Sequence, residues 1–337
     1  MQRRSWILRI LIGLLTTLTA TPALATGAAQ PTSTPAPPAV SSSPAQTPFS
    51  DMAAETWALP ALTKLLAVGA VSPDPEGLFR PNDPVTRAEL AKLLLGARRV
   101  QPLCNGLFAD APCTSWAGPY VETAYRLGVL DLVGAEAIYP DGLVTREELM
   151  TYGIRAASKR FAAGQLDRQE VTGILLGFSD RSLLTKEHQA EVALAVKLGL
   201  FNGYADGTLR PTAWASRAEA AVLASRLLQE GAVLTAIGDR SLPVKASWQM
   251  KATAYSPGEP GVGTVTYSGM AVRTGTVAVD PTKIPLGSWV FVDGWGYGIA
   301  ADTGGAIKGA RIDLFTWNYA EAALHFGVQN RTVWLLG

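Results

Sequence analysis

Short runs of alternating apolar and polar residues fill the C-terminal part of the chain, and this two-residue period is the pattern of β-strands. The runs are separated by Gly and Pro, which favour turns. Strands are predicted at residues 277–280, 288–293, 297–302 and 312–314, with a hairpin turn at residues 294–296. In the last run Ile312 and Leu314 face the core, so Asp313 faces the opposite side. The pattern predicts an all-β domain over residues 248–337.

An apolar run at residues 6–15 predicts an export signal at the N-terminus. Three arginines lie in or before this run, and Ala23-Leu24-Ala25 after it has the spacing of a cleavage site. The run is too short to span a bilayer, so we expect residues 1–25 to be removed and no stable membrane span to remain; an uncleaved anchor is the alternative. Residues 26–47 carry no charge and are rich in Pro, Ser, Thr and Ala, which predicts a flexible linker.

The region between residues 48 and 230 repeats one pattern three times. Each unit opens with Phe-x-Asp, and a later helix in the unit starts with Ser/Thr-Arg-x-Glu. The first motif begins at Phe49, Phe108 and Phe178, and the second at Thr86, Thr145 and Ser216. The first two copies of each motif are 59 residues apart. We therefore predict three helical hairpins, at residues 48–104, 105–170 and 171–230, and a connector at residues 231–247.

The Ser/Thr and Glu of the second motif form a capping box, in which each side chain satisfies a free backbone amide at the helix start. An arginine follows the cap residue in every unit, at Arg87, Arg146 and Arg217. A cation in the first turn opposes the helix dipole unless an anion is nearby. Arginine beside free helix-start amides is typical of a carboxylate or phosphate site, so we predict anion binding there. A purely structural bundle is the alternative.

The charge of the chain argues against nucleic acid as a partner. Removal of residues 1–25 takes away three arginines and no acidic residue, which lowers the net charge from +1 to −2. Two histidines and two cysteines do not make a zinc site at known spacing, so no metal and no cofactor are expected. Cys104 and Cys113 are nine residues apart in an exported chain, and we predict that they form a local disulfide.

Asp280, Asp302 and Asp313 lie at strand ends or on the strand face away from the core. Side chains in such positions can converge on one groove, and clustered carboxylates are the usual groups that cut glycosidic bonds. Two alternatives stay open: Asp302 can belong to a tight turn with the glycines that follow it, and the three carboxylates can bind a divalent cation.

Aromatic residues are concentrated in the same region, which contains five of the nine tryptophans. An indole ring is a suitable platform for the apolar face of a sugar. Trp295 and Trp317 are the predicted platforms, because they lie in a turn and beside the aspartate strand. Trp289 and Trp334 alternate with apolar residues and are predicted to lie in the core.

Residues 251–336 resemble the 3D domain, a double-psi β-barrel named for its three aspartates and related to the catalytic barrel of MltA-type lytic transglycosylases. The resemblance covers about the last quarter of the chain without gaps. The matching words are ATAY at 252–255, GTVAVDP at 275–281, IPLG at 284–287, GYG at 296–298, ADTGGAIKG at 301–309 and RIDLF at 311–315.

This resemblance implies cleavage of the β-1,4 bond between N-acetylmuramic acid and N-acetylglucosamine in peptidoglycan. One acid protonates the leaving oxygen, and the 6-hydroxyl of the same sugar closes a 1,6-anhydro ring. By position in the motif the acid and base is Asp313, with Asp302 as the neighbour that helps keep it protonated and Asp280 as an orienting residue. The residues expected to bind substrate are Tyr255, Thr303, Lys308, Trp295 and Trp317.

The three helical units resemble S-layer homology (SLH) repeats. The matching motifs are Thr-Arg-Ala-Glu and the Phe-x-Asp that opens each unit. Such repeats bundle as a pseudo-threefold set and hold anionic, often pyruvylated, secondary cell-wall polymers in grooves between units. The resemblance implies an all-α trimer bundle of helical hairpins, in which Arg87, Arg146 and Arg217 bind polymer. The second unit departs from the pattern through Glu147 and its cysteine loop, so its groove is expected to be the weakest.

Together these patterns predict an exported, multidomain protein of the cell wall or cell-envelope surface. The leading hypothesis is an SLH-anchored lytic transglycosylase whose partners are peptidoglycan glycan strands and a wall polymer. One rival is a non-catalytic protein that binds or loosens wall polysaccharide. The other is a hydrolase that uses water and therefore needs a second carboxylate.

Overall fold

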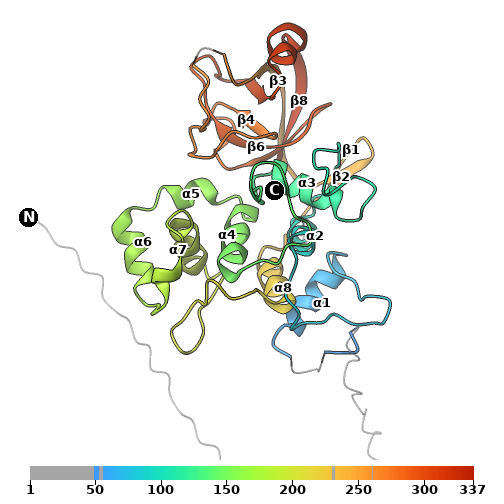
Figure 1. The fold of residues 1–337 in the computed structure, drawn as a ribbon. Coiled ribbons are helices and arrows are strands. Elements are labelled where there is room, and N and C mark those ends of the chain that lie inside the picture. The colour runs from blue at the N-terminus through green and yellow to red at the C-terminus, as the bar shows by residue number, and fades with distance from the viewer. Residues whose placement is uncertain (1–48, 53–55, 230–231, 260) are drawn as a thin grey trace, which may run out of the picture. The chain divides into compact units, whose positions relative to one another are not determined.

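The computed structural model describes residues 49–52, 56–229, 232–259 and 261–337. The predicted signal at residues 1–25 and the linker at residues 26–47 lie outside the described residues. In Figure 1 the helical part is coloured from blue to yellow and the barrel from orange to red. No helix in the described part of the chain is long and apolar enough to cross a bilayer.

The region of the three predicted units is helical. Its elements are α1 (Leu59–Ala67), α2 (Arg87–Ala97), α3 (Gly118–Arg126), α4 (Arg146–Ala156), α5 (Arg160–Gly164), α6 (Arg168–Leu175), the 3-10 helix η1 (Arg181–Leu183), α7 (Gln189–Lys197) and α8 (Arg217–Arg226). The helix starts predicted from the capping boxes are confirmed, because Thr86, Thr145 and Ser216 each cap a helix reciprocally with the glutamate three residues later. Helix α5, near the end of the second predicted unit, and helix α6, across its boundary with the third, were not predicted.

The aspartate of each Phe-x-Asp motif holds a turn later in its own unit. Its carboxylate accepts two neighbouring backbone N–H groups, and the second belongs to a residue with a positive φ of 46–58°. Left-handed backbone is unfavourable for residues other than glycine, so the carboxylate stabilises the turn. The pairs are Asp51 with Phe79 and Arg80, Asp110 with Ile138 and Tyr139, and Asp180 with Leu209 and Arg210.

Backbone hydrogen bonds connect the helix starts of the three units in cyclic order. The first N–H of each second helix donates to a carbonyl of the next unit, at 2.9 Å in all three cases. These bonds run from Arg87 to Gly142, from Arg146 to Ala213 and from Arg217 to Asp83. The prediction that the helix-start amides are free for a ligand is therefore wrong, because neighbouring units occupy them.

The C-terminal part forms a closed six-stranded β-barrel with the strand order β3-β7-β4-β6-β5-β8 (Figure 1). Its strands are β3 (Val244–Tyr255), β4 (Thr276–Ala278), β5 (Trp289–Val292), β6 (Gly296–Asp302), β7 (Arg311–Phe315) and β8 (Gln329–Leu336), with the π-helix η2 (Glu321–Phe326) before β8. The all-β prediction is confirmed, as is the antiparallel β5–β6 hairpin. A small antiparallel pair, β1 (Thr235–Ile237) and β2 (Arg240–Leu242), lies where a connector was predicted.

The barrel has an apolar core of its own, and it also shares one with the helices. Ile312 and Leu314 are buried inside the barrel, as the alternating pattern predicts, while Asp313 between them is partly exposed. Trp289 and Tyr297, on the barrel's other face, belong to the same buried cluster as the helical core. The barrel thus depends on the helices for the burial of large aromatic side chains, so a fragment holding the barrel alone would expose them to water.

Arg273, in the loop before β4, joins the barrel to the helical part. Its guanidinium donates to the carbonyl of Leu130 at 2.9 Å and to the carboxylate of Asp131 at 2.7 Å. Two residues later, Gly275 packs against α3 with a φ of +101°, and a Cβ there would lie 2.3 Å from the carbonyl oxygen of Arg126. Only glycine allows this approach.

Candidate functional site

Asp313 lies in the middle of β7, between two neighbouring strands. It is in register with Thr253 of β3 on one side and with Ala278 of β4 on the other. The hydroxyl of Thr253 donates to the Asp313 carboxylate at 2.7 Å. Its neighbours along the strand are buried in the core, so the backbone of Asp313 is fixed, and Thr253 holds its side chain.

The surroundings of Asp313 favour its protonated form. The pKa of the Asp313 carboxyl is raised to about 6, chiefly by burial and also by the negative charge of Glu259, while the hydrogen bond from Thr253 acts in the opposite direction. The expectation that Asp302 supplies the raising charge is not met, because Glu259 does so. Glu259 was missed in the sequence, where it lies in a Gly- and Pro-rich segment without a strand pattern.

Asp302 is the last residue of β6, as predicted, and its carboxylate accepts three hydrogen bonds. The backbone N–H groups of Tyr267 and Thr303 each donate at 2.9 Å, and the Tyr255 hydroxyl donates at 3.3 Å. Burial raises the pKa of Tyr255, and the charges of Asp302 and then Asp313 raise it further. Tyr255 therefore lies near both carboxylates and keeps its proton, which allows it to donate.

Asp280 has a structural role in this site. One of its carboxylate oxygens accepts from the backbone and the hydroxyl of Thr282, at 3.0 and 2.7 Å, and the other accepts from the Gly309 backbone at 2.7 Å. The Gly309 bond is the main cause that lowers the pKa of Asp280 to about 2. A carboxyl with this pKa is ionised near neutral pH and has no proton to donate, so its contacts favour a loop-holding role. The orienting role expected from the sequence stays a prediction.

The two predicted sugar platforms differ in the structure. Trp317 is 60% exposed and contacts the ring of Phe315 edge-on, at 4.9 Å between centroids. Trp295 instead packs against the barrel core, which does not fit the predicted stacking role. Lys308 is exposed near Asp280, and Thr303 contributes its backbone amide to Asp302. Tyr267, which is exposed beside Asp302, was missed in the sequence.

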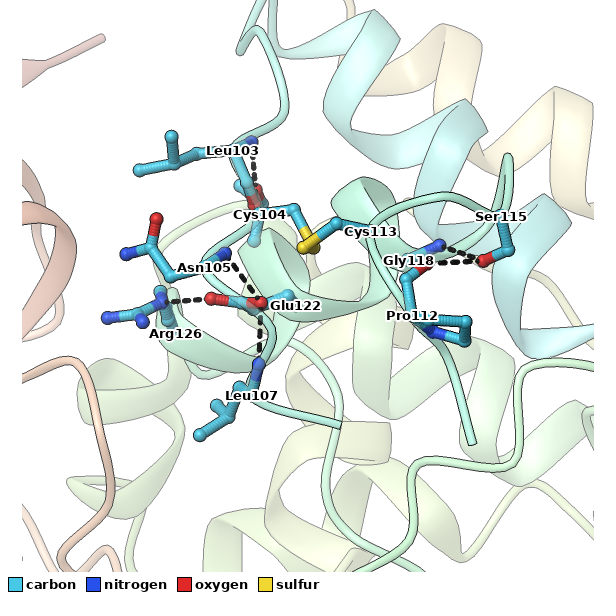
Figure 2. The surroundings of a disulfide bond; sticks show 11 residues. Leu103, Cys104, Asn105, Leu107, Pro112, Cys113, Ser115, Gly118, Glu122 and Arg126 are labelled. Atoms are coloured by element: carbon cyan, nitrogen blue, oxygen red, sulfur yellow. Dashed lines mark hydrogen bonds and ion pairs between the residues drawn. A yellow bond between two sulfur atoms is a disulfide. The ribbon is translucent and has the colours of Figure 1, made fainter. Parts of the chain in front are cut away.

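The three aspartates do not form a metal-binding cluster. Among the described residues, the group with suitable ligand spacing is Cys104, Cys113 and Glu122. The two cysteines are joined in a disulfide, as Figure 2 shows, and so are not thiolate ligands. The divalent-cation alternative for the aspartates has no support from their geometry.

The raised pKa of Asp313 predicts a defined pH dependence. If the protonated carboxyl is the reactive form in a reaction at this site, kcat/KM for that reaction will be highest below a pH of about 6 and will fall about tenfold per pH unit above it. Glu259→Gln removes a negative charge that raises this pKa, so the fall will move to lower pH. Rates measured across the pH range for both proteins check this. An unchanged profile in Glu259→Gln would contradict the role of that carboxylate.

The three arginines of the helical units lie in grooves, but protein groups occupy their guanidinium groups. The Nε atoms of Arg87, Arg146 and Arg217 each donate to a backbone carbonyl of another unit at 2.8 Å. Arg146 also pairs with Glu219, and Arg217 with Glu89. Arg87 and Arg146 are only 3% exposed. These contacts join the three units to one another, which gives the arginine at this position a structural role.

Each groove nevertheless combines its arginine with an exposed tryptophan. The grooves have volumes of about 150, 200 and 560 Å³ and contain Arg146 with Trp57, Arg217 with Trp116, and Arg87 with Trp214. In the second unit, Glu147 accepts hydrogen bonds from Thr185 and pairs with His188 at 2.6 Å. The Glu147 carboxylate is thus bound by groups of the protein itself.

Comparison with known proteins matches both parts of the chain to family models. The 3D domain matches residues 275–337, and the S-layer homology domain matches residues 48–91, 107–150 and 185–221. Cell wall-binding protein YocH of Bacillus subtilis (strain 168) is 44% identical over 89 residues, covering 25% of this chain and 31% of YocH. Amylopullulanase of Thermoanaerobacterium thermosulfurigenes is 29% identical over 177 residues, covering 52% of this chain and 9% of that protein.

The matched regions span less than a third of either relative's length. Among solved structures, MltA from E. coli is similar over 23% of this chain and 28% of its own, with 25% identity and a TM-score of 0.20. The S-layer homology repeats identify the chain as an exported protein of the cell surface. Its two recognisable parts are thus a set of S-layer homology repeats and a C-terminal 3D domain.

Proposed function

We propose that the chain is a cell-wall-anchored lytic transglycosylase that cleaves the β-1,4 bond between N-acetylmuramic acid and N-acetylglucosamine. The observation that carries the proposal is Asp313, a partly buried carboxyl that is held by Thr253 and has a pKa raised to about 6. A group with this pKa can both give and take a proton near neutral pH, which one-residue acid and base catalysis requires.

The proposed reaction uses Asp313 twice. Its carboxyl gives a proton to the glycosidic oxygen, and the N-acetylglucosamine side leaves with a new hydroxyl. The 6-hydroxyl of the muramic sugar attacks the anomeric carbon, and the Asp313 carboxylate takes the proton that this hydroxyl loses. The product is a 1,6-anhydro ring, no water is consumed, and Asp313 ends as it began. Asp302 and Tyr255 would orient the sugar from the adjacent strand ends.

The arrangement of carboxylates favours this route over hydrolysis by water. A hydrolase needs a second carboxylate as base or nucleophile. Around Asp313 in the described structure, Asp302 already accepts three hydrogen bonds, and Glu259 accepts two from Ser256. Both are held by protein donors, which leaves the intramolecular hydroxyl as the better nucleophile.

The helical units would anchor the enzyme to a secondary cell-wall polymer. We infer that the three hairpins form one pseudo-threefold bundle, and the cyclic hydrogen bonds between their helix starts support this. The name of YocH, a cell wall-binding protein, is consistent with attachment to the wall and keeps a second candidate open, a barrel that binds glycan without cleaving it. Incubation of the full chain with purified peptidoglycan separates the two, because only an enzyme releases soluble fragments.

Anchoring predicts a loss of wall binding when a groove tryptophan is removed. Trp116→Ala deletes an exposed ring beside Arg217 and touches none of the bonds between units. We expect binding to whole walls, measured by co-sedimentation, to weaken about five- to tenfold. Walls stripped of secondary polymer serve as the control and should bind both proteins equally weakly. Equal binding of both proteins to whole walls would argue against this groove as an attachment site.

A further inference from the structure

A cavity of about 570 Å³ lies between the barrel and the second helical unit. The barrel side consists of Thr274 and Trp317, and the helical side is formed mainly by residues 107–110 and 135–137. We propose that this cavity is a further glycan-binding subsite, so that the second unit completes the substrate groove as well as belonging to the anchor. The inference rests on the proposed function and extends its site.

A line of aromatic rings leads from the candidate catalytic carboxylates to the cavity. Asp313 and Phe315 are two residues apart on β7 and project to the same face of the strand. The ring of Phe315 contacts that of Tyr255 at 5.3 Å and that of Trp317 at 4.9 Å. Tyr255 in turn donates to Asp302. The rings of Phe315 and Tyr255 are buried, at 1% and 7% exposed, so they lie beneath this path and do not stack on sugar. A glycan strand that lies over Asp313 and passes above these two rings reaches the exposed ring of Trp317.

The chemistry of the cavity selects an uncharged sugar chain. Its lining contains no lysine or arginine, whereas each of the three grooves of the helical units contains an arginine. An anionic wall polymer would find no cation here and would meet the exposed carboxylate of Glu136. An amino-sugar backbone has apolar faces for the indole of Trp317 and hydroxyl and amide donors for Glu136.

A disulfide and several hydrogen bonds hold the helical wall of the cavity, and Figure 2 shows them. The Cys104–Cys113 disulfide closes the loop, and buried Glu122 accepts the backbone N–H groups of Asn105 and Leu107 at 3.0 and 3.1 Å. Arg126 pairs with the other oxygen of Glu122 at 2.9 Å. A wall fixed before the ligand arrives loses little entropy on binding. The cysteine loop, which sets the second unit apart, thus acquires a function.

Hydrogen bonds also hold the other parts of the cavity lining in place. The Asp110 carboxylate accepts the Ile138 and Tyr139 amides, which ties the two helical segments of the lining to each other. Arg273, next to Thr274, binds the carbonyl of Leu130 and the carboxylate of Asp131. Both sides of the cavity are therefore tied to the same part of the second unit.

The test measures the preference for long glycan strands in the full chain. All proteins carry Asp313→Asn so that they bind without turnover, and the probes are uncharged β-1,4-linked N-acetylglucosamine oligomers, which lack the lactyl carboxylate of muramic acid. A short oligomer fills only the site at Asp313, and a long one extends past Trp317. We expect the parent to prefer the long oligomer. Trp317→Ala, and Ala135→Trp at an exposed position of the other wall, should each reduce this preference about five- to tenfold without changing affinity for the short oligomer.

Tyr319→Ala is the matched control, because it deletes an exposed ring two residues beyond Trp317 that does not line the cavity. It should keep the parent's preference. An undiminished preference in both Trp317→Ala and Ala135→Trp would overturn the subsite and leave the proposed function intact, provided the wild type releases wall fragments. A parent that binds neither oligomer, together with a wild type that releases nothing, would overturn both.

Discussion

Asp313→Asn is expected to reduce the rate of peptidoglycan cleavage by about a hundred- to ten-thousand-fold, which is the usual contribution of a positioned acid and base. The amide cannot give up or take the proton that the glycosidic oxygen and the 6-hydroxyl exchange. It keeps the size of the carboxyl and can still meet the Thr253 hydroxyl at this position. Binding and stability should therefore change little, and release of soluble fragments from purified wall measures the rate.

Asp293→Asn is the matched control, since Asp293 is an exposed aspartate at the end of β5 in the same barrel. It should retain the wild-type rate. If the cleavage rate of Asp313→Asn is less than tenfold below that of the wild type, Asp313 is not the acid and base. If Asp313→Asn keeps the biological effect on the wall as well as the binding, the barrel is a binding or loosening module.

Arg155→Met is expected to have the largest effect on stability, about 3–5 kcal/mol of the free energy of unfolding. The Arg155 side chain is only 3% exposed and pairs with two carboxylates, with Glu191 at 2.8 Å and with Asp131. Methionine fills similar volume without the charge, so the buried Glu191 would lose its closer partner and keep only Arg160, at 3.9 Å. Denaturant unfolding of the full chain measures the change.

Arg168→Met is the control for this substitution, because Arg168 is an exposed arginine at the start of α6. It should stay within about 0.5 kcal/mol of wild type. Since Asp131 also binds Arg273 of the barrel, Arg155→Met should loosen the joint between the barrel and the helices. A loss below about 1 kcal/mol would show that this charge cluster does little for stability.

Local patterns in the sequence predicted the elements of both parts. Capping boxes depend on residues three apart, and alternation along a strand depends on residues two apart, so each is visible without knowledge of the fold. This is why the starts of α2, α4 and α8 and the orientation of Ile312, Asp313 and Leu314 were predicted correctly.

Contacts between distant segments could not be predicted in the same way. The amides at the three helix starts are occupied by carbonyls from other units, and the Arg217 guanidinium binds a carbonyl 138 residues away. Glu259 raises the pKa of Asp313 from a loop without periodicity, and Trp295 is partly buried against the barrel core although its turn position suggested exposure. In each case the partner is set by tertiary structure, about which the local pattern carries no information.

The shared core of the helices and the barrel changes how the function should be tested. Trp289 and Tyr297 of the barrel pack in the helical core, and Arg273 is bonded to the second unit. A barrel fragment would therefore lose both burial and ion pairs. Activity and binding are therefore properties to measure on the full chain.

The most direct measurement is mass spectrometry of the soluble products that the full chain releases from purified peptidoglycan, beside the Asp313→Asn variant. We expect muropeptides that end in a 1,6-anhydro ring, released by the wild type and not by the variant. Products with reducing ends would contradict the intramolecular mechanism and indicate hydrolysis by water. An absence of soluble products from the wild type would contradict the proposal that the protein is an enzyme.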